Sequence, residues 1–566
     1  MAINGVSGML PPLTASTVTI SIAFVLAYLI LHALSPAIDP REPPLVKARI
    51  PLVGHIIGFM RYQAQYHINL QRSTRKPIAT LPMLTGKLYA VWDPHLVAAG
   101  LRSKSLSTKP HTNAVMPALT QISDDTANLL RSPRGDHLFD RIMLHAIPAS
   151  FKGASIERLN ETALAGLAAQ LTTLAAPAGD EKTTAAAEVP NTWLWLRGLL
   201  TSATGKALYG AEHNPFATAT HPRVEPALWD LESNLLKLTL NLPAALASAG
   251  HRARETLVQA LAPYYAARHD EDPSASDFVR FRAAELRAAG IPAEDIAHVE
   301  IMLPFAALAN TVPLLFWLFC FVFSRQELVA RLRGEVETLV ATTSINSTAK
   351  RDGDIGDQGS NNRKVVTLRV AASVIEERCP LLMSCYRETL RRTVHQVSTR
   401  TAMQDTVLSD RSGREYLLKA GSVVQMAIGA SHAVEDYWGD DVDEFRPERF
   451  LRRAAGDGGG DDGPGSPRAM RAAFQPFGGG THLCPGRHFA FTEMMAVMAT
   501  LLLGFEVQPL EGTEWKLPAF ATRSVIDAVT KPARRGEGFG VRITRREGWE
   551  GVQWKYEMLD TGRRSE

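Results

Sequence analysis

The sequence predicts a mainly α-helical protein with a minor β part. Helical periodicity is clear in segments such as residues 157–176 and 276–290, which both end at helix-breaking positions. From about residue 52 to residue 290 the chain reads as helices joined by loops. Strand signals are few and gather after residue 397, in TAMQDTVLS, EYLLKAG and SVVQMAIGAS. We therefore expect a large helical body that carries a small sheet.

The composition fits a globular protein with a large core. The chain has 566 residues, of which 45% are hydrophobic and 21% are charged. Its 61 basic and 58 acidic residues leave a net charge of +3, which is too balanced for nucleic-acid binding. No CxxC pair occurs among the four cysteines, so we expect a reducing compartment and thiol chemistry that rests on a single thiolate.

The N-terminus predicts a membrane anchor, because residues 1–38 contain no charged residue and residues 13–34 can cross about 30 Å of hydrocarbon as a helix. A signal peptide would show a basic start and a cleavage site, and neither is evident. Arg41, Lys47 and Arg49 follow the span and favour a cytosolic body. Prolines make residues 39–51 a stiff neck. The predicted division is an anchor (1–38), a neck (39–51) and a single domain (52–566).

A second apolar run, residues 301–324, also has the length of a membrane span. Pro304, Asn310, Thr311 and Pro313 interrupt it and favour a buried central helix instead, with a second membrane span as the alternative. The polar pair Asn310 and Thr311 would then mark a functional site. Residues 342–364 and 454–468 are polar or glycine-rich, so we expect solvated loops there.

The stretch FGGGTHLCPGR, residues 477–487, places Cys484 in a flexible loop just before an apolar helix predicted over residues 487–504. The glycines let a flat ligand approach, and backbone N–H groups can hydrogen-bond to the sulfur. Three other interpretations are a phosphate-binding loop, a zinc site with His482 and a free structural cysteine. No Gly-Lys-Ser/Thr follows and no second zinc-ligand pair is present, so a metal-bound thiolate is favoured.

This loop resembles the haem-binding signature of cytochromes P450, Phe-x-x-Gly-x-Arg-x-Cys-x-Gly. Phe477, Gly480, Cys484 and Gly486 match the signature, and His482 stands where arginine is usual. The resemblance implies the cytochrome P450 fold behind an N-terminal transmembrane helix. It also implies haem b, with Cys484 as the axial ligand of the iron and His482 at a haem propionate.

Two further motifs stand in the family's order. ETLR supplies Glu388 and Arg391, and FRPERF supplies Arg449, which together resemble the family's structural ion triad. Arg400 lies near the place of another propionate-binding arginine, with a surface arginine as the alternative interpretation. The family's early Trp-x-x-x-Arg motif has no clean match in GDHLFDRIMLHAI.

The central helix departs from the family pattern Ala/Gly-Gly-x-Asp/Glu-Thr-Thr/Ser. In AALANT, Ala309 replaces the acid and Asn310 the first threonine, while Thr311 is kept. Asn310 and Thr311 are therefore the candidate catalytic residues. ANTVPLLFW also resembles the branch of cholesterol 7-alpha-hydroxylase, sterol 12-alpha-hydroxylase and prostacyclin synthase, which contains both hydroxylases and a peroxide-rearranging enzyme.

The resemblance implies a haem-thiolate monooxygenase that uses O2 and electrons from NADPH, passed on by NADPH–cytochrome P450 reductase. Its substrate would be small and apolar, of sterol, terpenoid or lipid type, with residues 112–122 as a candidate pocket wall. The expected location is the endoplasmic reticulum membrane, single-pass, with the catalytic domain in the cytosol. The alternatives are an isomerase or lyase that rearranges a lipid peroxide without a reductase, and a haem-binding protein without catalysis.

Overall fold

The computed structural model describes residue 25 and residues 38–48, 53–84, 86–176, 186–346, 363–451, 466–512, 514–537 and 539–558. Apart from residues 25 and 38, the N-terminal anchor predicted for residues 1–38 lies outside these ranges. The anchor and the division into anchor, neck and one domain therefore stay predictions. The described part of the neck contains no helix, and residues 43–46 run beside the first strand of the main sheet.

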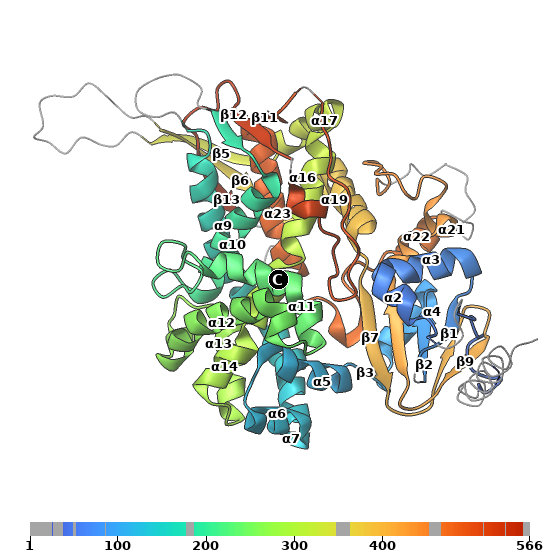
Figure 1. The fold of residues 1–566 in the computed structure, drawn as a ribbon. Helices are drawn as coiled ribbons and strands as arrows, with labels where there is room; N and C mark the ends of the chain where they lie inside the picture. The colour runs from blue at the N-terminus through green and yellow to red at the C-terminus, as the bar shows by residue number, and fades with distance from the viewer. Residues whose placement is uncertain are drawn as a thin grey trace, which may run out of the picture.

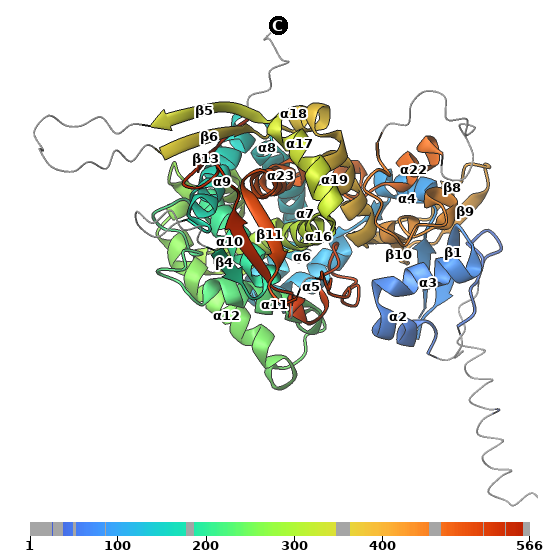
Figure 2. The same cartoon turned by 90° about the horizontal axis from the view of Figure 1, so that it is seen from above.

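Helices make up most of the described chain, as predicted, and Figures 1 and 2 show them gathered into one large body beside a smaller part that is rich in strands. The helices of the first half are α2 (Ile56–Tyr62), α3 (Ala64–Thr74), α4 (Pro94–Arg102), α5 (Lys109–Thr120), α6 (Asp124–Arg131), α7 (Pro133–Asp140), the π-helical η1 (Arg141–Ala146), α8 (Ile147–Ser150), α9 (Gly153–Thr173), α10 (Thr192–Tyr209), α11 (Val224–Thr239), α12 (Ala244–Ala266), η2 (His269–Glu271) and α13 (Asp277–Ala288). The helices predicted over residues 157–176 and 276–290 are confirmed as α9 and α13.

The second half adds the buried centre of the helical body. Its helices are α14 (Ala293–Glu300), α15 (Met302–Leu308), α16 (Thr311–Phe323), α17 (Gln326–Glu337), α18 (Ala372–Arg378), α19 (Pro380–Thr393), α20 (Ile428–Ser431), α21 (Glu435–Trp438), α22 (Pro467–Ala473), η3 (Gly480–His482), α23 (Arg487–Gly504) and η4 (Ala533–Gly536). Every residue of α16 is buried, and α23 is buried from Phe491 onward. The predicted apolar helix over residues 487–504 is confirmed as α23.

The main sheet has the strand order β1-β2-β10-β7-β3. Its strands are β1 (Ile78–Pro82), β2 (Lys87–Val91), β3 (Leu106–Ser107), β7 (Val397–Ala402) and β10 (Val423–Ala427). All neighbouring pairs are antiparallel except β2 with β10, and Arg400 on β7 stands opposite Val424 on β10. The sheet therefore places residues 397–402 between β10, which follows soon after in the sequence, and β3, which lies far earlier.

Three smaller sheets complete the β part. Their strands are β8 (Thr406–Ser409) with β9 (Glu415–Leu418), then β11 (Phe505–Pro509), β12 (Val541–Arg545) and β4 (Ala186–Val189), and finally β13 (Gln553–Glu557), β6 (Arg363–Arg369) and β5 (Val340–Asn346). The prediction that strands gather after residue 397 is wrong for β1 to β6. β1 and β2 are short, almost wholly buried runs without the alternation that reveals a half-exposed strand. The solvated loop predicted for residues 342–364 is also wrong at its ends, because β5 and β6 pair with each other there.

The central apolar run is not one continuous helix. α14 ends at Glu300, four residues before Pro304. α15 ends at Leu308, five residues before Pro313. A proline cannot donate to the carbonyl four residues earlier, and its ring clashes with that carbonyl, so both interruptions follow from the sequence. Within the described chain, Ala293–Phe323 is the single helical run long and apolar enough to cross a membrane, and 78% of its apolar window is buried inside the protein. That burial fits the predicted central helix.

Candidate functional site

The loop that carries Cys484 is closed by its own backbone. The N–H of Cys484 donates to the carbonyl of Phe477 over 3.0 Å, and Nη1 of Arg487 donates to the carbonyl of Cys484 over 2.9 Å. Burial raises the pKa of the Cys484 thiol, while backbone N–H donors of Gly486 and Arg487 and the charge of Arg487 act against that rise. These donors and the N-terminus of α23 all favour a negatively charged sulfur at this position.

Two of the loop glycines are required by the backbone. Gly478 and Gly480 have φ angles of 74° and 63°, in the left-handed region that other residues avoid. A Cβ on Gly480 would lie 2.3 Å from the carbonyl oxygen of Leu101, the next-to-last residue of α4. Gly486 has an ordinary φ of −78° and caps α23. The loop can therefore press its backbone onto the end of α4 because position 480 has no side chain.

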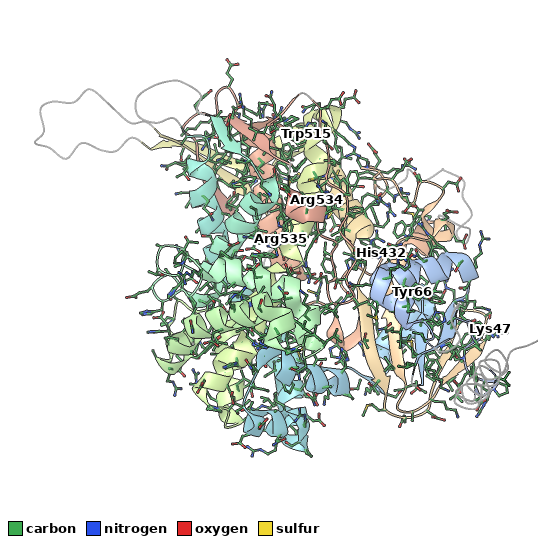
Figure 3. All side chains as sticks on the ribbon, viewed as in Figure 1. Lys47, Tyr66, His432, Trp515, Arg534 and Arg535 are labelled. Carbon is green, nitrogen blue, oxygen red and sulfur yellow. The ribbon has the colours of Figure 1, made fainter. Side chains whose placement is uncertain are left out.

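Glu388, Arg391 and Arg449 form one buried network. Glu388 accepts hydrogen bonds of 2.8 Å from both Nε and Nη2 of Arg391 and one of 3.0 Å from Nε of Arg449. Nη1 of Arg391 donates to the carbonyl of His432, whose ring Nε2 accepts the N–H of Gln475 at 3.3 Å. His432 is labelled in Figure 3. The network thus ties α19 to the segment that leads into the Cys484 loop.

Arg400 and His482 meet at a cavity of about 330 Å³. Its lining residues are Leu101, Thr108, Thr112, Phe139, Met143, Gln396, Ser398, Arg400, Ile428, Gly478, Gly479 and His482. Arg400 is only 2% exposed, so its interpretation as a surface arginine is wrong. Its Nη1 donates to the carbonyl of Leu106 over 3.1 Å, whereas Nε and Nη2 are buried and have no partner among the described residues. Burial and the charge of Arg400 lower the pKa of His482.

Asn310 and Thr311 lie at the interruption between α15 and α16. Thr311 is buried, and its hydroxyl donates to the carbonyl of Ala307 over 2.9 Å. Oδ1 of Asn310 accepts the N–H of Ala528 at 3.3 Å. The sequence marked this pair as a site, but it did not reveal that the chain after α23 returns to contact it.

The segment that follows α19 connects the surroundings of Asn310 with the cavity that Arg400 lines. Val394 forms a β-bridge with Val529, and the N–H of His395 donates to the carbonyl of Ala528 over 2.8 Å. Ala528 is the residue whose own N–H binds Asn310. Residues 394–402 therefore run from the partner of Asn310 into β7, which lines the cavity that contains Arg400.

Comparison with known proteins decides the family. The chain is 33% identical over 547 residues to a cytochrome P450 monooxygenase of Gibberella zeae, an alignment that covers 94% of this chain and 95% of that protein. The chain belongs to the cytochrome P450 family. A model of this family matches residues 368–532, and cytochrome P450 monooxygenase nodJ of Hypoxylon pulicicidum is 29% identical over 93% of this chain and 94% of its own. These relatives mark the protein as an oxidoreductase, and they do not support the finer prediction of the cholesterol 7-alpha-hydroxylase and prostacyclin synthase branch.

The residues at the site fit the haem of a cytochrome P450. A haem offers iron, which a thiolate can ligate, and two carboxylates, which need donors. Cys484 supplies the sulfur, and the free Nε and Nη2 of Arg400 are a buried cationic edge that lacks an anion. The glycine backbone on the cavity wall, at Gly478 and Gly479, leaves room for a flat ring. The individual roles of these residues toward a haem stay predictions.

The structure also finds residues that the sequence did not identify. Phe139 of α7 and Met143 of η1 line the cavity with Arg400 and lie one helical turn apart. The stretch GDHLFDRIMLHAI has no clean match to the family's Trp-x-x-x-Arg, so no sequence signal identified these two residues. Thr112, predicted as part of a pocket wall, lines this cavity together with Thr108.

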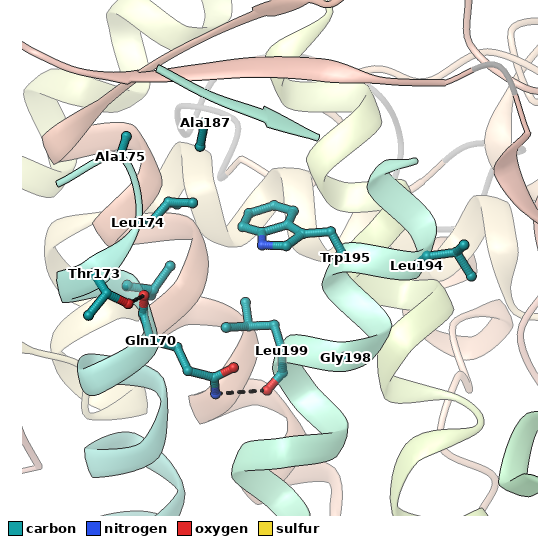
Figure 4. Close-up of a pocket in the computed structure, with 10 residues that line it drawn as sticks. Gln170, Thr173, Leu174, Ala175, Ala187, Leu194, Trp195, Gly198 and Leu199 are labelled. Carbon is teal, nitrogen blue, oxygen red and sulfur yellow. Dashed lines mark hydrogen bonds between the residues drawn. The ribbon is translucent and has the colours of Figure 1, made fainter. Parts of the chain in front are cut away.

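Two other cavities lie away from Cys484 and Asn310. One of about 550 Å³ lies between α9 and α10 and is shown in Figure 4. It contains no charged lining residue, and its glutamine, Gln170, donates to the carbonyl of Leu199 over 3.2 Å. The other, of about 1060 Å³, is a groove lined by α9, β13 and the start of α23. Neither includes a residue predicted for the site.

Proposed function

We propose that this protein is a membrane-anchored haem-thiolate monooxygenase that inserts one oxygen atom from O2 into a small apolar substrate. Electrons come from NADPH through a cytochrome P450 reductase. The observation that carries the proposal is the environment of Cys484, where two backbone N–H donors face the sulfur. The relatives named as cytochrome P450 monooxygenases support it, because they match nearly the whole length of this chain.

Bound haem supplies the iron at which oxygen is activated, and a thiolate ligand favours cleavage of the O–O bond. Cys484 would provide that thiolate, and the donors from Gly486 and Arg487 favour its charged form against the burial that raises the pKa of the thiol. Arg400 would hold a haem carboxylate through its buried and unpartnered Nε and Nη2. The ion triad around Glu388 holds the loop in place and takes no direct part in the chemistry.

Asn310 and Thr311 are the residues that would orient oxygen or water in this proposal. Oδ1 of Asn310 is already occupied by the N–H of Ala528, so the side chain can offer its amide N–H groups to a ligand or a water molecule. The hydroxyl proton of Thr311 is given to Ala307, so Thr311 can accept a hydrogen bond but must turn before it donates one. Ala309 supplies no acid. Protons would then arrive through water, which the amide N–H groups of Asn310 can orient.

The substrate class follows from the family and from the anchor. An apolar sterol-, terpenoid- or lipid-like molecule dissolves in a membrane and reaches an anchored enzyme from there. The uncharged N-terminal segment, followed by Arg41, Lys47 and Arg49, supports a single-pass protein of the endoplasmic reticulum with a cytosolic catalytic domain. Digestion of intact microsomes with protease should therefore destroy the catalytic domain.

A second function is an isomerase or lyase that rearranges a lipid peroxide without reductase. It is favoured by Asn310 in place of the family's threonine and by Ala309 in place of its acid, since a peroxide substrate already contains the O–O bond. The resemblance of ANTVPLLFW to the prostacyclin synthase branch motivates the same alternative.

The carbon-monoxide difference spectrum of the reduced protein in microsomes tests the thiolate first. A strongly red-shifted Soret band is expected, whereas a band typical of histidine ligation would overturn the assignment of Cys484. Turnover under 18O-labelled O2 with NADPH and reductase then separates the two functions. Label in the product supports the monooxygenase, and unlabelled product formed from a peroxide without reductase supports the isomerase.

A further inference from the structure

The cavity shared by Arg400 and His482 contains a single permanently charged side chain. Of its lining residues, only Arg400 carries a charge that does not depend on pH. The loop position that holds an arginine in the family signature holds His482 here, whose charge depends on pH. The cavity therefore offers one permanent cation to a cofactor that presents two carboxylates.

The guanidinium of Arg400 has free donors for one carboxylate. Nη1 is used by the carbonyl of Leu106, which leaves the edge formed by Nε and Nη2. The same edge binds a carboxylate through both nitrogens in three other pairs of this chain, Arg391–Glu388, Arg282–Glu300 and Arg41–Asp39. One such edge matches the two oxygens of one carboxylate, so the second carboxylate needs other donors.

Hydroxyl groups on α5 are those donors. Thr108 is the N-cap residue of α5, yet its side chain makes no capping hydrogen bond. Thr112 lies one helical turn later, so both side chains occupy the same face of the helix. Both line the cavity, and they belong to a different element from Arg400 on β7. Gln396 and Ser398 lie on the same segment as Arg400 and so add to the carboxylate that Arg400 binds.

We propose that Arg400 binds one haem carboxylate through Nε and Nη2 and that the hydroxyls of Thr108 and Thr112 hold the other. Neutral donors on α5 thus take the place of a second cation. The proposal rests on the proposed function in one respect, namely that the cofactor is haem. Retention of the cofactor then depends on α5, a helix that contributes no ligand to the iron.

The test measures how fast ferric haem leaves the purified full-length protein for an excess of apomyoglobin. Replacing both threonines (Thr108→Val, Thr112→Val) removes the hydroxyls at nearly constant volume and is expected to speed haem loss by about 10-fold or more. Arg400→Lys keeps the charge but loses the two-nitrogen edge, and a similar acceleration is expected. His111→Ala is the control, because His111 is exposed on α5 and does not line the cavity.

A further variant distinguishes the loss of the hydroxyl groups from a general loss of folding. His482→Arg puts a second cation into the same cavity, so in this background the two valine substitutions should change haem loss less than 3-fold, about the size of a marginal hydrogen bond. Unchanged release from the double valine variant would overturn the role of α5, and unchanged release from Arg400→Lys would overturn the role of the arginine edge. A wild-type protein whose reduced CO complex lacks the thiolate band would overturn the proposed haem-thiolate function, which is a separate readout.

Discussion

Removal of Glu388 should destabilise the protein far more than removal of a surface carboxylate on a neighbouring helix. Glu388 is fully buried and accepts four hydrogen bonds: two from Arg391, one from Arg449 and one from the N–H of Arg446. In Glu388→Ala, two guanidinium groups whose side chains are 1% and 5% exposed lose their shared countercharge. Breaking a buried ion pair in this way costs about 3–5 kcal/mol.

The value expected here is at the lower end, about 3 kcal/mol, because both arginines keep other partners. Arg449 retains Asp441 at 2.9 Å, and Arg391 retains backbone carbonyls. The control is Glu376→Ala, which breaks the ion pair of Glu376 with Arg387. The side chain of Glu376 is 61% exposed, so this substitution should cost less than about 1 kcal/mol. Urea unfolding followed by circular dichroism measures both variants. If they unfold at the same urea concentration, the triad does not stabilise the fold and the reasoning is refuted.

Three further predictions concern the loop and the buried helix behind it. Cys484→Ser should abolish the thiolate-type CO difference spectrum, and a spectrum that survives would mean that another residue is the ligand. Gly480→Ala should lower both the thermal midpoint and the haem content. Its loss of stability should exceed the roughly 1–2 kcal/mol that a left-handed alanine costs, because its Cβ would lie 2.3 Å from the carbonyl oxygen of Leu101. Gly421→Ala, with a φ of 75° and open space, is the matched control and should show the backbone cost alone. Burial raises the pKa of Glu493 to about 8 from 4.5, so the folded state keeps a proton that the unfolded state releases. Wild-type stability should fall by up to about 1.4 kcal/mol per pH unit as pH rises from about 5 to 8, and Glu493→Gln should flatten this dependence in unfolding experiments at several pH values.

The elements that could be predicted are those whose signal is local. The bounds of α23 follow from an uninterrupted apolar run after the Cys484 loop, and the pairing of Glu388 with Arg391 follows from a spacing of three on one helix. The interruption before Asn310 was also predictable, since Pro313 stands in the printed sequence and excludes a continuous hydrogen-bond ladder. Sequence patterns of this kind fix which residues share a helix face.

The features that could not be predicted depend on contacts between distant segments. The sequence left Arg400 equally open to burial or exposure, because its environment is made by β10, β3 and the Cys484 loop. β1 and β2 were not predicted because they are almost wholly buried, and strands buried on both faces lack the alternation of polar and apolar residues. The carbonyl of His432 that binds Arg391 has no sequence signal at all, because any residue supplies a carbonyl.

One short segment links Asn310 to Arg400. It starts where His395 binds Ala528, the residue whose N–H holds Asn310, and it reaches Arg400 after five residues. An extended strand rises about 3.3 Å per residue, so this distance spans roughly 16 Å. Asn310 and Arg400 are therefore connected by a single backbone segment, which pairs with the chain after α23 at Val394 and with β10 along β7. Oδ1 of Asn310 accepts the N–H of Ala528, and the carbonyl of Ala528 accepts the N–H of His395, so one residue links Asn310 to the segment that leads into β7. In the proposed function, an amide in place of the acid–alcohol pair can then remain well ordered, because a backbone contact holds its oxygen.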